Sequence, residues 1–295
     1  MVDSGNALYR TVGVNDAMAV KRADFILLRM GRLGTFAMAV GARDLNAGPA
    51  AIKAIADKAK LKLLSANLTG KDGKLLFPGS VVATVGSVRV GLIGVSPPGP
   101  VEGSPGVKGA PVVAAVAKEA KALKGKVDLV VVLAAAPYPD ALQISTELGD
   151  AVDLILNSHD SRGAGPAQRS EKNYLLPSGE RGRQVGRLDL DLNGKGLFAD
   201  KDEATREAQL VPMLKSQVVE LRKRLDLATD EKVRADLKAS ITALEASQKA
   251  HEKNAAPDVR GARTLKLTWL SLGPEVTDEK TLKEEVDKLE AVPPR

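Results

Sequence analysis

The sequence predicts an α/β protein that carries a long helical hairpin, and three observations lead to this class. Short aliphatic and β-branched runs, such as Val127–Leu133 and Ala151–Leu156, are typical of strands that are buried on both faces. Segments of helical character lie between these runs. From Asp202 to Asn254 the chain has no glycine and one proline, and its apolar residues recur at spacings of three and four, as in amphipathic helices.

Composition excludes several classes of function. With 295 residues, the chain can form one large domain or one domain with an appendage. The net charge of +6 is spread over many lysines, and aromatic residues make up only 3% of the chain, so we expect no nucleic-acid partner. There is no cysteine, which excludes disulfides, zinc–thiolate sites and thiol nucleophiles. No run approaches the ~18 apolar residues of a membrane span, and no signal peptide is recognisable.

The N-terminal third is expected to alternate between strands and helices. Pro49 suits the first turn of a helix, and Asp16 lies near the start of another. The expected elements are a turn-like Val2–Ala7, a helix at Asn15–Lys21, a strand or helix at Phe25–Leu28, a turn at Met30–Thr35, a buried strand at Phe36–Val40, a polar loop at Gly41–Gly48, a helix at Pro49–Lys60 and a strand at Leu61–Leu64.

The middle of the chain begins with a hairpin around Gly86-Ser87 and continues as alternating strands and helices. The expected elements are strands at Val81–Val85 and Val88–Val95, a Gly- and Pro-rich loop up to Gly109, a helix at Pro111–Leu123, a strand at Val127–Leu133 that Ala134–Tyr138 closes, a helix at Asp140–Leu148 and a strand at Ala151–Leu156.

The C-terminal part is expected to combine strands with the helical hairpin. Asn193-Gly194 is a tight-turn signal after a strand that alternates apolar and charged residues. Two antiparallel helices are favoured over one continuous helix, which would reach ~75 Å, and Thr229 or Asp230 could cap the second. The remaining expected elements are strands at Tyr174–Leu176, Arg187–Leu192 and Thr264–Leu272, and a helix at Thr277–Leu289 with Thr277 as its cap.

A polar cluster, Asn157-Ser-His-Asp-Ser-Arg162, follows the predicted strand at Ala151–Leu156. In open α/β sheets, ligands bind at the carboxyl ends of the strands. If the chain has a functional site, we expect it at this edge.

Several motifs together resemble the calcineurin-like metallophosphoesterases of the 5′-nucleotidase branch. Val2-Asp-Ser-Gly-Asn6 is similar to the family's Asp-Ala-Gly-Asp strand end, and Gly41–Gly48 is similar to its Gly-Asn-His-Glu loop. Leu64-Ser-Ala-Asn67 and Val90-Gly-Leu-Ile-Gly94 match family strands in full. Weaker echoes follow at Leu133–Pro137, at Asn157–Ser161, and at Gly179, Gly182, Gly186 and Leu188, so the resemblance covers about residues 2–200.

The resemblance implies two facing β-sheets flanked by helices, a four-layer αββα arrangement. Together with the change of composition after Asp202, it divides the chain into a metallophosphoesterase-like domain at 1–200, the helical hairpin at 201–256, and a C-terminal strand and helix at 257–295 that we expect to pack on the main domain. It also places the family's first strand, which carries Asp-x-His, before Met1. Relatives are commonly exported, so the resemblance implies a periplasmic or cell-surface protein.

The family's metal-binding chemistry does not carry over to this chain. By resemblance, Asn6 stands at the bridging aspartate, Ala42 at the asparagine ligand, Arg43 at the catalytic histidine, Ala135 at a histidine ligand and Ser161 at another, while His159 is kept. Two close divalent ions need an anionic bridging ligand, and alanine offers no donor. Without metals the two-metal mechanism lacks its nucleophile. We therefore expect no dinuclear metal site, no cofactor and no catalytic residue.

We call the positions that correspond to the family's metal site the relic site, and it also includes Asp44 and Asp160. The role of its polar residues is open between two interpretations. Arg43, His159 and Arg162 could bind an anion. Alternatively, His159 is a structural histidine and Arg43 pairs with Asp44 or Asp160.

The leading functional hypothesis is a catalytically degenerate domain kept for structure, binding or assembly. The alternative is a metal-dependent phosphohydrolase, acting on nucleotides or other phosphoesters, with an atypical site. The hairpin at 203–253 has an apolar stripe that needs a covering surface, which could be this domain, a second copy or another protein.

Overall fold

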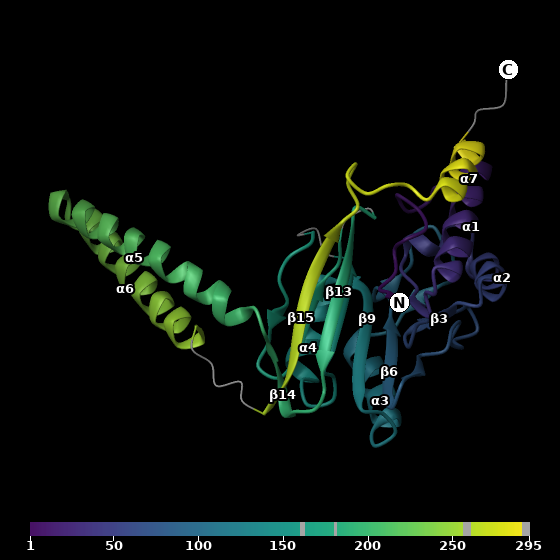
Figure 1. The fold of residues 1–295 in the computed structure, drawn as a ribbon, viewed down its shortest axis with the longest axis horizontal. Coiled ribbons are helices and arrows are strands. Elements are labelled where there is room, and N and C mark those ends of the chain that lie inside the picture. Colours follow the sequence, from purple (N-terminus) through teal and green to yellow (C-terminus); the bar gives the residue numbers. More distant parts are fainter. Residues whose placement is uncertain (160–162, 180–181, 256–260, 291–295) are drawn as a thin grey trace. The chain divides into compact units, whose positions relative to one another are not determined.

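The computed structural model describes residues 1–159, 163–179, 182–255 and 261–290, and it divides the chain into two compact units (Figure 1). The first unit contains Met1–Arg187 together with Thr268–Arg295. The second unit contains Leu188–Leu267.

The first unit begins with a small parallel sheet in the order β1-β2-β3. Its strands are β1 (Val2–Asp3), β2 (Ala37–Ala39) and β3 (Lys62–Leu64), and two helices connect them, α1 (Ala17–Arg32) and α2 (Pro49–Ala59). Asp16 caps α1, because its carboxylate accepts hydrogen bonds from the backbone amides of Met18 and Ala19, both at 3.0 Å. The start of α1 was predicted, but the helix also includes Phe25–Leu28, which the sequence left open between strand and helix.

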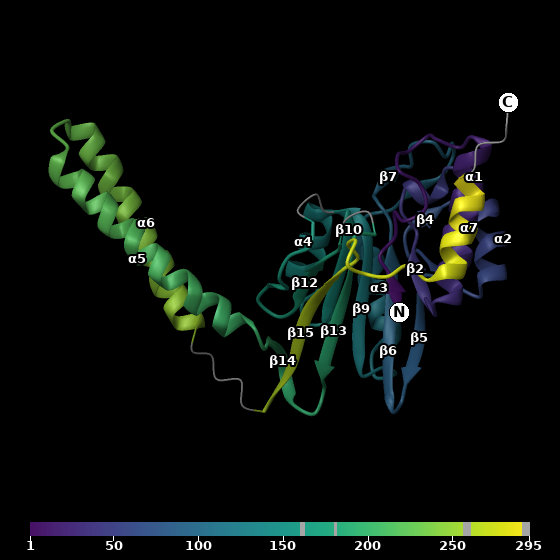
Figure 2. The ribbon, with the colours of Figure 1, turned by 45° about the horizontal axis from the view of Figure 1, so that its top comes forward.

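A larger sheet in the same unit has the order β11-β12-β10-β9-β6-β5 (Figure 2). Strands β6, β9, β10 and β12 are parallel to one another, and β5 and β11 pair antiparallel at the two edges. The elements are β5 (Ser80–Val85), β6 (Val88–Val95), α3 (Val112–Leu123), β9 (Leu129–Pro137), α4 (Tyr138–Glu147), β10 (Leu154–His159), β11 (Gln168–Arg169) and β12 (Tyr174–Pro177).

These elements form the four layers that the resemblance implied. Helices α1 and α2 bury Leu27 and Ile52 in one cluster with Met38 of the small sheet. Helices α3 and α4 pack in a second cluster against the large sheet, where Val116 meets Ile155 and its neighbours. The two sheets approach closely, since a Cβ built on Gly94 of β6 would lie 2.4 Å from the Cβ of Leu64 in β3. The predicted fold class is therefore confirmed.

The loops of the first unit contain short elements that the sequence did not indicate. They are the 3₁₀ helix η1 (Arg43–Leu45) and a three-stranded sheet of β4 (Leu68–Thr69), β7 (Gly99–Pro100) and β8 (Lys108–Gly109). Asn67 joins this region to the large sheet. Its amide nitrogen donates to the carbonyls of Ser96, at 2.8 Å, and Ala110, at 2.9 Å.

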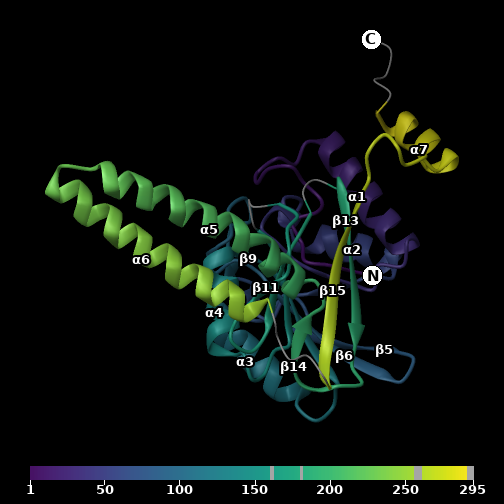
Figure 3. The ribbon, with the colours of Figure 1, turned by 60° about the vertical axis from the view of Figure 1, so that its left-hand side comes forward.

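The predicted helical hairpin is confirmed in the second unit, as α5 (Glu203–Leu227) and α6 (Glu231–Asn254), two long adjacent helices (Figure 3). Asp230, one of the two predicted caps, accepts a hydrogen bond from the amide of Val233 at 2.9 Å. Leu214, Val218 and Ile241 are buried. Within the described residues, no helix has the length and apolar character that a membrane crossing requires.

A third sheet has the order β13-β15-β14, with β13 (Gln184–Asp191), β14 (Lys195–Asp200) and β15 (Ala262–Ser271). Strand β14 was not predicted. It pairs in parallel with β15, and the paired residues, such as Asp200 and Leu265, lie more than sixty positions apart in the sequence. The residues of β14 alone therefore do not predict a strand.

Several predicted boundaries are wrong. The predicted turn at Met30–Thr35 begins within α1, which continues to Arg32. Strand β9 does not close at Ala134 but continues to Pro137, because Ala134, Ala135 and Ala136 are fully buried in the sheet. The last helix, α7 (Lys280–Glu290), begins three residues after the predicted cap at Thr277. The carboxylate of Glu279 instead accepts from the amides of Thr281, at 3.1 Å, and Leu282, at 2.6 Å.

We predict that Gly31→Ala destabilises the protein, although alanine is the better helix former by ~1 kcal/mol. A Cβ at Gly31 would lie 2.2 Å from the carbonyl oxygen of Ala59, so α1 and α2 would have to separate. We expect a net loss of about 2 kcal/mol in the free energy of unfolding, measured by urea denaturation followed by circular dichroism.

Gly165→Ala is the matched control, because the nearest atom to its Cβ would be a carbon of Pro177 at 3.9 Å. Equal stability of the Gly31→Ala protein and the wild type would show that this close approach does not constrain the two helices.

Candidate functional site

The carboxyl ends of β1, β2, β9 and β10 meet in the first unit, at the edge where the sequence placed the site. A Cβ on Gly5, which follows β1, would lie 2.5 Å from the carbonyl oxygen of Ala39 and 2.9 Å from the Cβ of Ala135. The hydroxyl of Ser158 in β10 donates to the carbonyl of Ser4 at 2.7 Å. Loops far apart in the sequence thus form one cluster.

Asp44 is the centre of this cluster. Its side chain is buried, and its carboxylate accepts hydrogen bonds from the backbone amides of Asn6, at 2.7 Å, Leu8, at 3.0 Å, and Gly41, at 2.8 Å. Burial raises the pKa of the Asp44 carboxyl, and the surrounding backbone amides oppose that shift. Asp44 therefore joins the loop after β1 to the loop after β2.

Asn6, the residue at the bridging-aspartate position, is held by its neighbours. Its backbone has φ of 62°, a left-handed conformation that asparagine tolerates better than most residues. Its side-chain oxygen accepts from the backbone amide of Arg43 at 3.3 Å. That oxygen would lie 2.2 Å from a Cβ on Gly41, so the amide fills the space that the glycine leaves. Asn6 acts here as a packing residue.

Ala42 and Ala135 offer no donor atom to any ligand. Ala42 is partly buried and packs on the core under α1 and α2. Ala135 is fully buried in β9, beside Gly5.

Arg43 extends toward the loop at 8–16. Its guanidinium donates to the carbonyl oxygen of Arg10 at 3.1 Å. The suggested pairing with Asp44 is wrong, since the Asp44 carboxylate is engaged by backbone amides. The other suggested partner, Asp160, lies outside the described residues.

His159 is the last residue of β10 and pairs with Pro137 of β9. Its side chain lies outside the described part of the structure, as do Asp160, Ser161 and Arg162. The hypothesis that Arg43, His159 and Arg162 bind an anion therefore stays a prediction. Among the described residues, no group of three or more His, Asp and Glu side chains could hold a metal ion.

Two further polar residues, Asp3 and Asn157, lie at this edge, and the sequence assigned neither of them a role of its own. Burial raises the pKa of the Asp3 carboxyl to about 6; the amide of Gly5, which donates to it at 2.7 Å, opposes the shift, and Asp44 adds to it. Asn157 is buried and donates to the carbonyls of Ala134, at 3.1 Å, and Ala136, at 2.7 Å. The available signals were the Val2–Asn6 motif for Asp3 and the polar cluster at 157–162 for Asn157.

The chain matches no protein-family model and no curated protein. Solved structures give clear similarities. A 5′-nucleotidase precursor from Thermus thermophilus is 24% identical, with a TM-score of 0.55, over 66% of this chain and 43% of its own. The sulfate thiohydrolase SoxB of the same organism, in complex with glycerol, is 19% identical, with a TM-score of 0.53, over 64% of this chain and 35% of its own.

The calcineurin-like phosphoesterase YfkN from Bacillus subtilis is 18% identical, with a TM-score of 0.51, over 64% of this chain and 70% of its own. The chain thus spans less than half the length of the nucleotidase precursor and of SoxB. These similarities show that the chain has the fold of 5′-nucleotidases and calcineurin-like phosphoesterases, and they confirm the sequence resemblance at that level.

We predict that Asp44→Asn lowers the free energy of unfolding by about 2–4 kcal/mol. An amide can accept with only one oxygen, and its NH₂ group would face amides that themselves donate. Thermal and urea denaturation followed by circular dichroism would measure the loss.

Asp57→Asn is the matched control, because Asp57 is exposed on α2. We expect that variant to lie within about 0.5 kcal/mol of the wild type. If Asp44→Asn also changes the free energy of unfolding by no more than about 0.5 kcal/mol, the Asp44 carboxylate does not hold the cluster together.

Proposed function

We propose that this chain, built on the fold of the 5′-nucleotidases, is a catalytically degenerate phosphoesterase-like domain that serves a structural, binding or assembly role. The observation that carries the proposal is that the polar side chains at the strand ends form hydrogen bonds within the protein itself. The oxygens of Asn6 and Asp44 accept hydrogen bonds from backbone amides within the cluster. They hold loops together and are not presented as a set of ligands.

The dinuclear metal centre expected for this fold does not fit the residues present. A pair of divalent ions requires anionic oxygens and imidazoles that converge on a shared position. Asn6 is neutral and its oxygen is engaged, while Ala42 and Ala135 contribute only methyl groups. A Cβ built on Gly5 would lie 2.9 Å from the Cβ of Ala135, so the backbone after β1 closely approaches β9 at this edge.

The helical hairpin supports the assembly part of the proposal. Its buried residues Leu214, Val218 and Ile241 close the contact between α5 and α6. Large apolar side chains remain exposed along it, with Met213 at 51% and Val219 at 52% of their full accessibility. Exposed apolar residues of this kind are typical of association surfaces when they lie close together. We propose that a second copy of the chain or another protein covers them.

A periplasmic or cell-surface location is part of the same proposal and rests on the sequence resemblance to a commonly exported family. Fractionation of the native organism, with the protein found only in the cytosolic fraction, would count against it.

We expect the purified chain to show no chelator-sensitive hydrolysis of p-nitrophenyl phosphate, bis-p-nitrophenyl phosphate or AMP, with manganese, zinc or magnesium added in turn. The reason is that the chain cannot assemble the metal-bound nucleophile that this fold would use. Release of p-nitrophenol and of inorganic phosphate, each with and without EDTA, gives the rates.

His159→Ala is the control that separates the chain's own activity from contamination, because His159 is the one histidine kept at the relic site. Hydrolysis that EDTA abolishes, and that is lost in His159→Ala, would overturn the proposal in favour of the alternative phosphohydrolase.

We expect the intact chain to have a mass above that of a monomer in size-exclusion chromatography with light scattering. Replacing residues 203–256 by a short Gly/Ser linker should give a monomer, since it removes α5 and α6. The double variant Leu210→Glu, Met213→Glu should also shift the equilibrium toward monomer, because both side chains are exposed apolar residues of α5.

Lys223→Glu on the same helix is the matched control for the change in charge. Monomeric mass for the intact chain would argue against self-association through the hairpin.

A further inference from the structure

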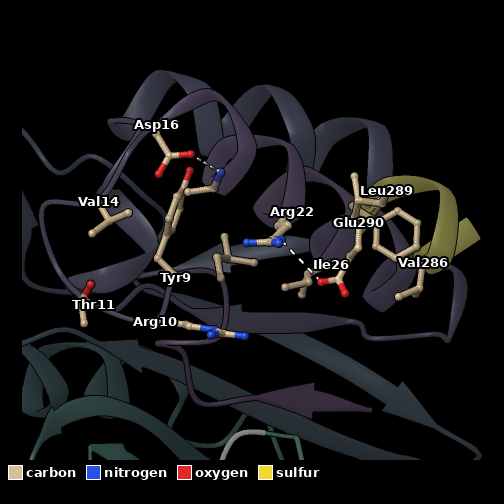
Figure 4. A pocket seen from close by; sticks show the side chains of 13 residues that line it. Tyr9, Arg10, Thr11, Val14, Asp16, Arg22, Ile26, Val286, Leu289 and Glu290 are labelled. Atoms are coloured by element: carbon tan, nitrogen blue, oxygen red, sulfur yellow. Dashed lines mark hydrogen bonds and ion pairs between the residues drawn. The ribbon is translucent and has the colours of Figure 1, made fainter. Parts of the chain in front are cut away.

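A hollow of about 340 Å³ lies in the first unit, between the loop at 8–16, helix α1 and helix α7 (Figure 4). None of Asn6, Ala42, Arg43 and Ala135 lines it. Its volume is at the lower end of the range found for small-molecule sites. The hollow is thus a separate feature from the cluster at the strand ends.

Apolar side chains form much of its lining. Leu8 comes from the loop, Phe25 and Ile26 from α1, and Val286 and Leu289 from α7. Ile26 keeps 37% of its accessibility in the structure as it stands. A bound apolar group would remove this surface from water, which is favourable in proportion to the area covered.

Two arginines give the hollow a cationic side. Figure 4 shows Arg10 and Arg22 extending toward it from the loop and from α1. Arg22 is 3.6 Å from Glu290, and both side chains are well exposed. Among the described residues, the Arg10 guanidinium has neither a hydrogen bond nor an ion pair. A carboxylate, sulfonate or phosphate is the partner that a guanidinium recognises best.

The acidic groups around the hollow are already engaged. The carboxylate of Asp16 accepts from the first amides of α1, and Glu290 faces Arg22. In the described part of the structure, neither carboxylate forms a hydrogen bond or an ion pair with Arg10.

Helix α7 forms one side of the hollow and contacts α1 mainly through surface side chains. It has no buried residue, and it rests on α1 through the ion pairs of Glu285 with Arg29 and Arg32 and of Glu290 with Arg22. The pairs of Arg22 and Arg32 are largely exposed to solvent and contribute little to stability, whereas Arg29 is mostly covered and holds Glu285 more firmly.

We propose that this hollow binds a small amphipathic anion, with its charged head on Arg10 and Arg22 and its apolar part between Ile26 and Leu289. This site does not depend on the proposed loss of catalysis. A medium-chain or aromatic carboxylate or sulfonate has the required size, with an anionic group at one end and an apolar part at the other.

Titration of the intact chain with 8-anilinonaphthalene-1-sulfonate tests the proposal, since this fluorescent probe combines a sulfonate with aromatic rings. We expect saturable binding with enhanced, blue-shifted emission. Arg10→Gln should raise the dissociation constant at least about tenfold, because it removes a charge that binds the sulfonate. Ile26→Asp should have a similar effect, because it removes apolar surface that contacts the rings. Arg222→Gln, on α5, should leave it unchanged.

The second experiment measures displacement of the probe by decanoate and by decanol, which share a ten-carbon chain and differ in charge. Decanoate should displace the probe from the wild type far better than decanol, and that preference should disappear in Arg10→Gln. Arg10 and Ile26 are both exposed, and unchanged circular dichroism would confirm that the variants fold.

Three results would overturn the site: no saturable binding up to millimolar probe, equal affinity of the wild type, Arg10→Gln and Ile26→Asp, or displacement by decanol as efficient as by decanoate.

Discussion

The buried carboxylate of Asp44 is the interaction on which the strand-end cluster depends. It lies in η1 and accepts amides from the loop after β1, at Asn6 and Leu8, and from Gly41 at the end of β2. A carboxylate in such a dry position is costly unless several donors surround it, and the backbone amides supply them. Two loops separated by more than thirty residues are thereby held in one arrangement, and Asn6 keeps its left-handed backbone within it.

Small residues allow the close packing of the strand ends, and the proposed absence of a metal centre rests in part on the same positions. Gly5, Ala39 and Ala135 are small, and the backbone after β1 lies directly on β2 and β9 because of it. This edge is therefore a closely packed junction, and burial stabilises it.

The sequence predicted most of the layers because buried parallel strands are continuous aliphatic runs, as β6 and β9 are. It did not predict what depends on distant partners. Ala134–Ala136 extend β9 because they are covered on both faces, although alanine alone favours no strand. Strand β14 exists through its pairing with β15, and Glu279 caps α7 in place of Thr277. At the site, resemblance indicated Asn6 and Ala135, but the central place of Asp44 became evident only in three dimensions.

The loop at 4–16 connects the packed junction to the hollow beside α1, and residues in and next to η1 fix its course. Asn46 is buried; its oxygen accepts from the amide of Gly13 at 3.1 Å, and its nitrogen donates to the carbonyls of Thr11, at 2.7 Å, and Val14, at 2.8 Å. Arg43 holds the carbonyl of Arg10. The backbone of the loop is bound in this way, and the exposed Arg10 side chain lines the hollow. The polar residues of this segment therefore stabilise the junction on one side and present a cation to the hollow on the other.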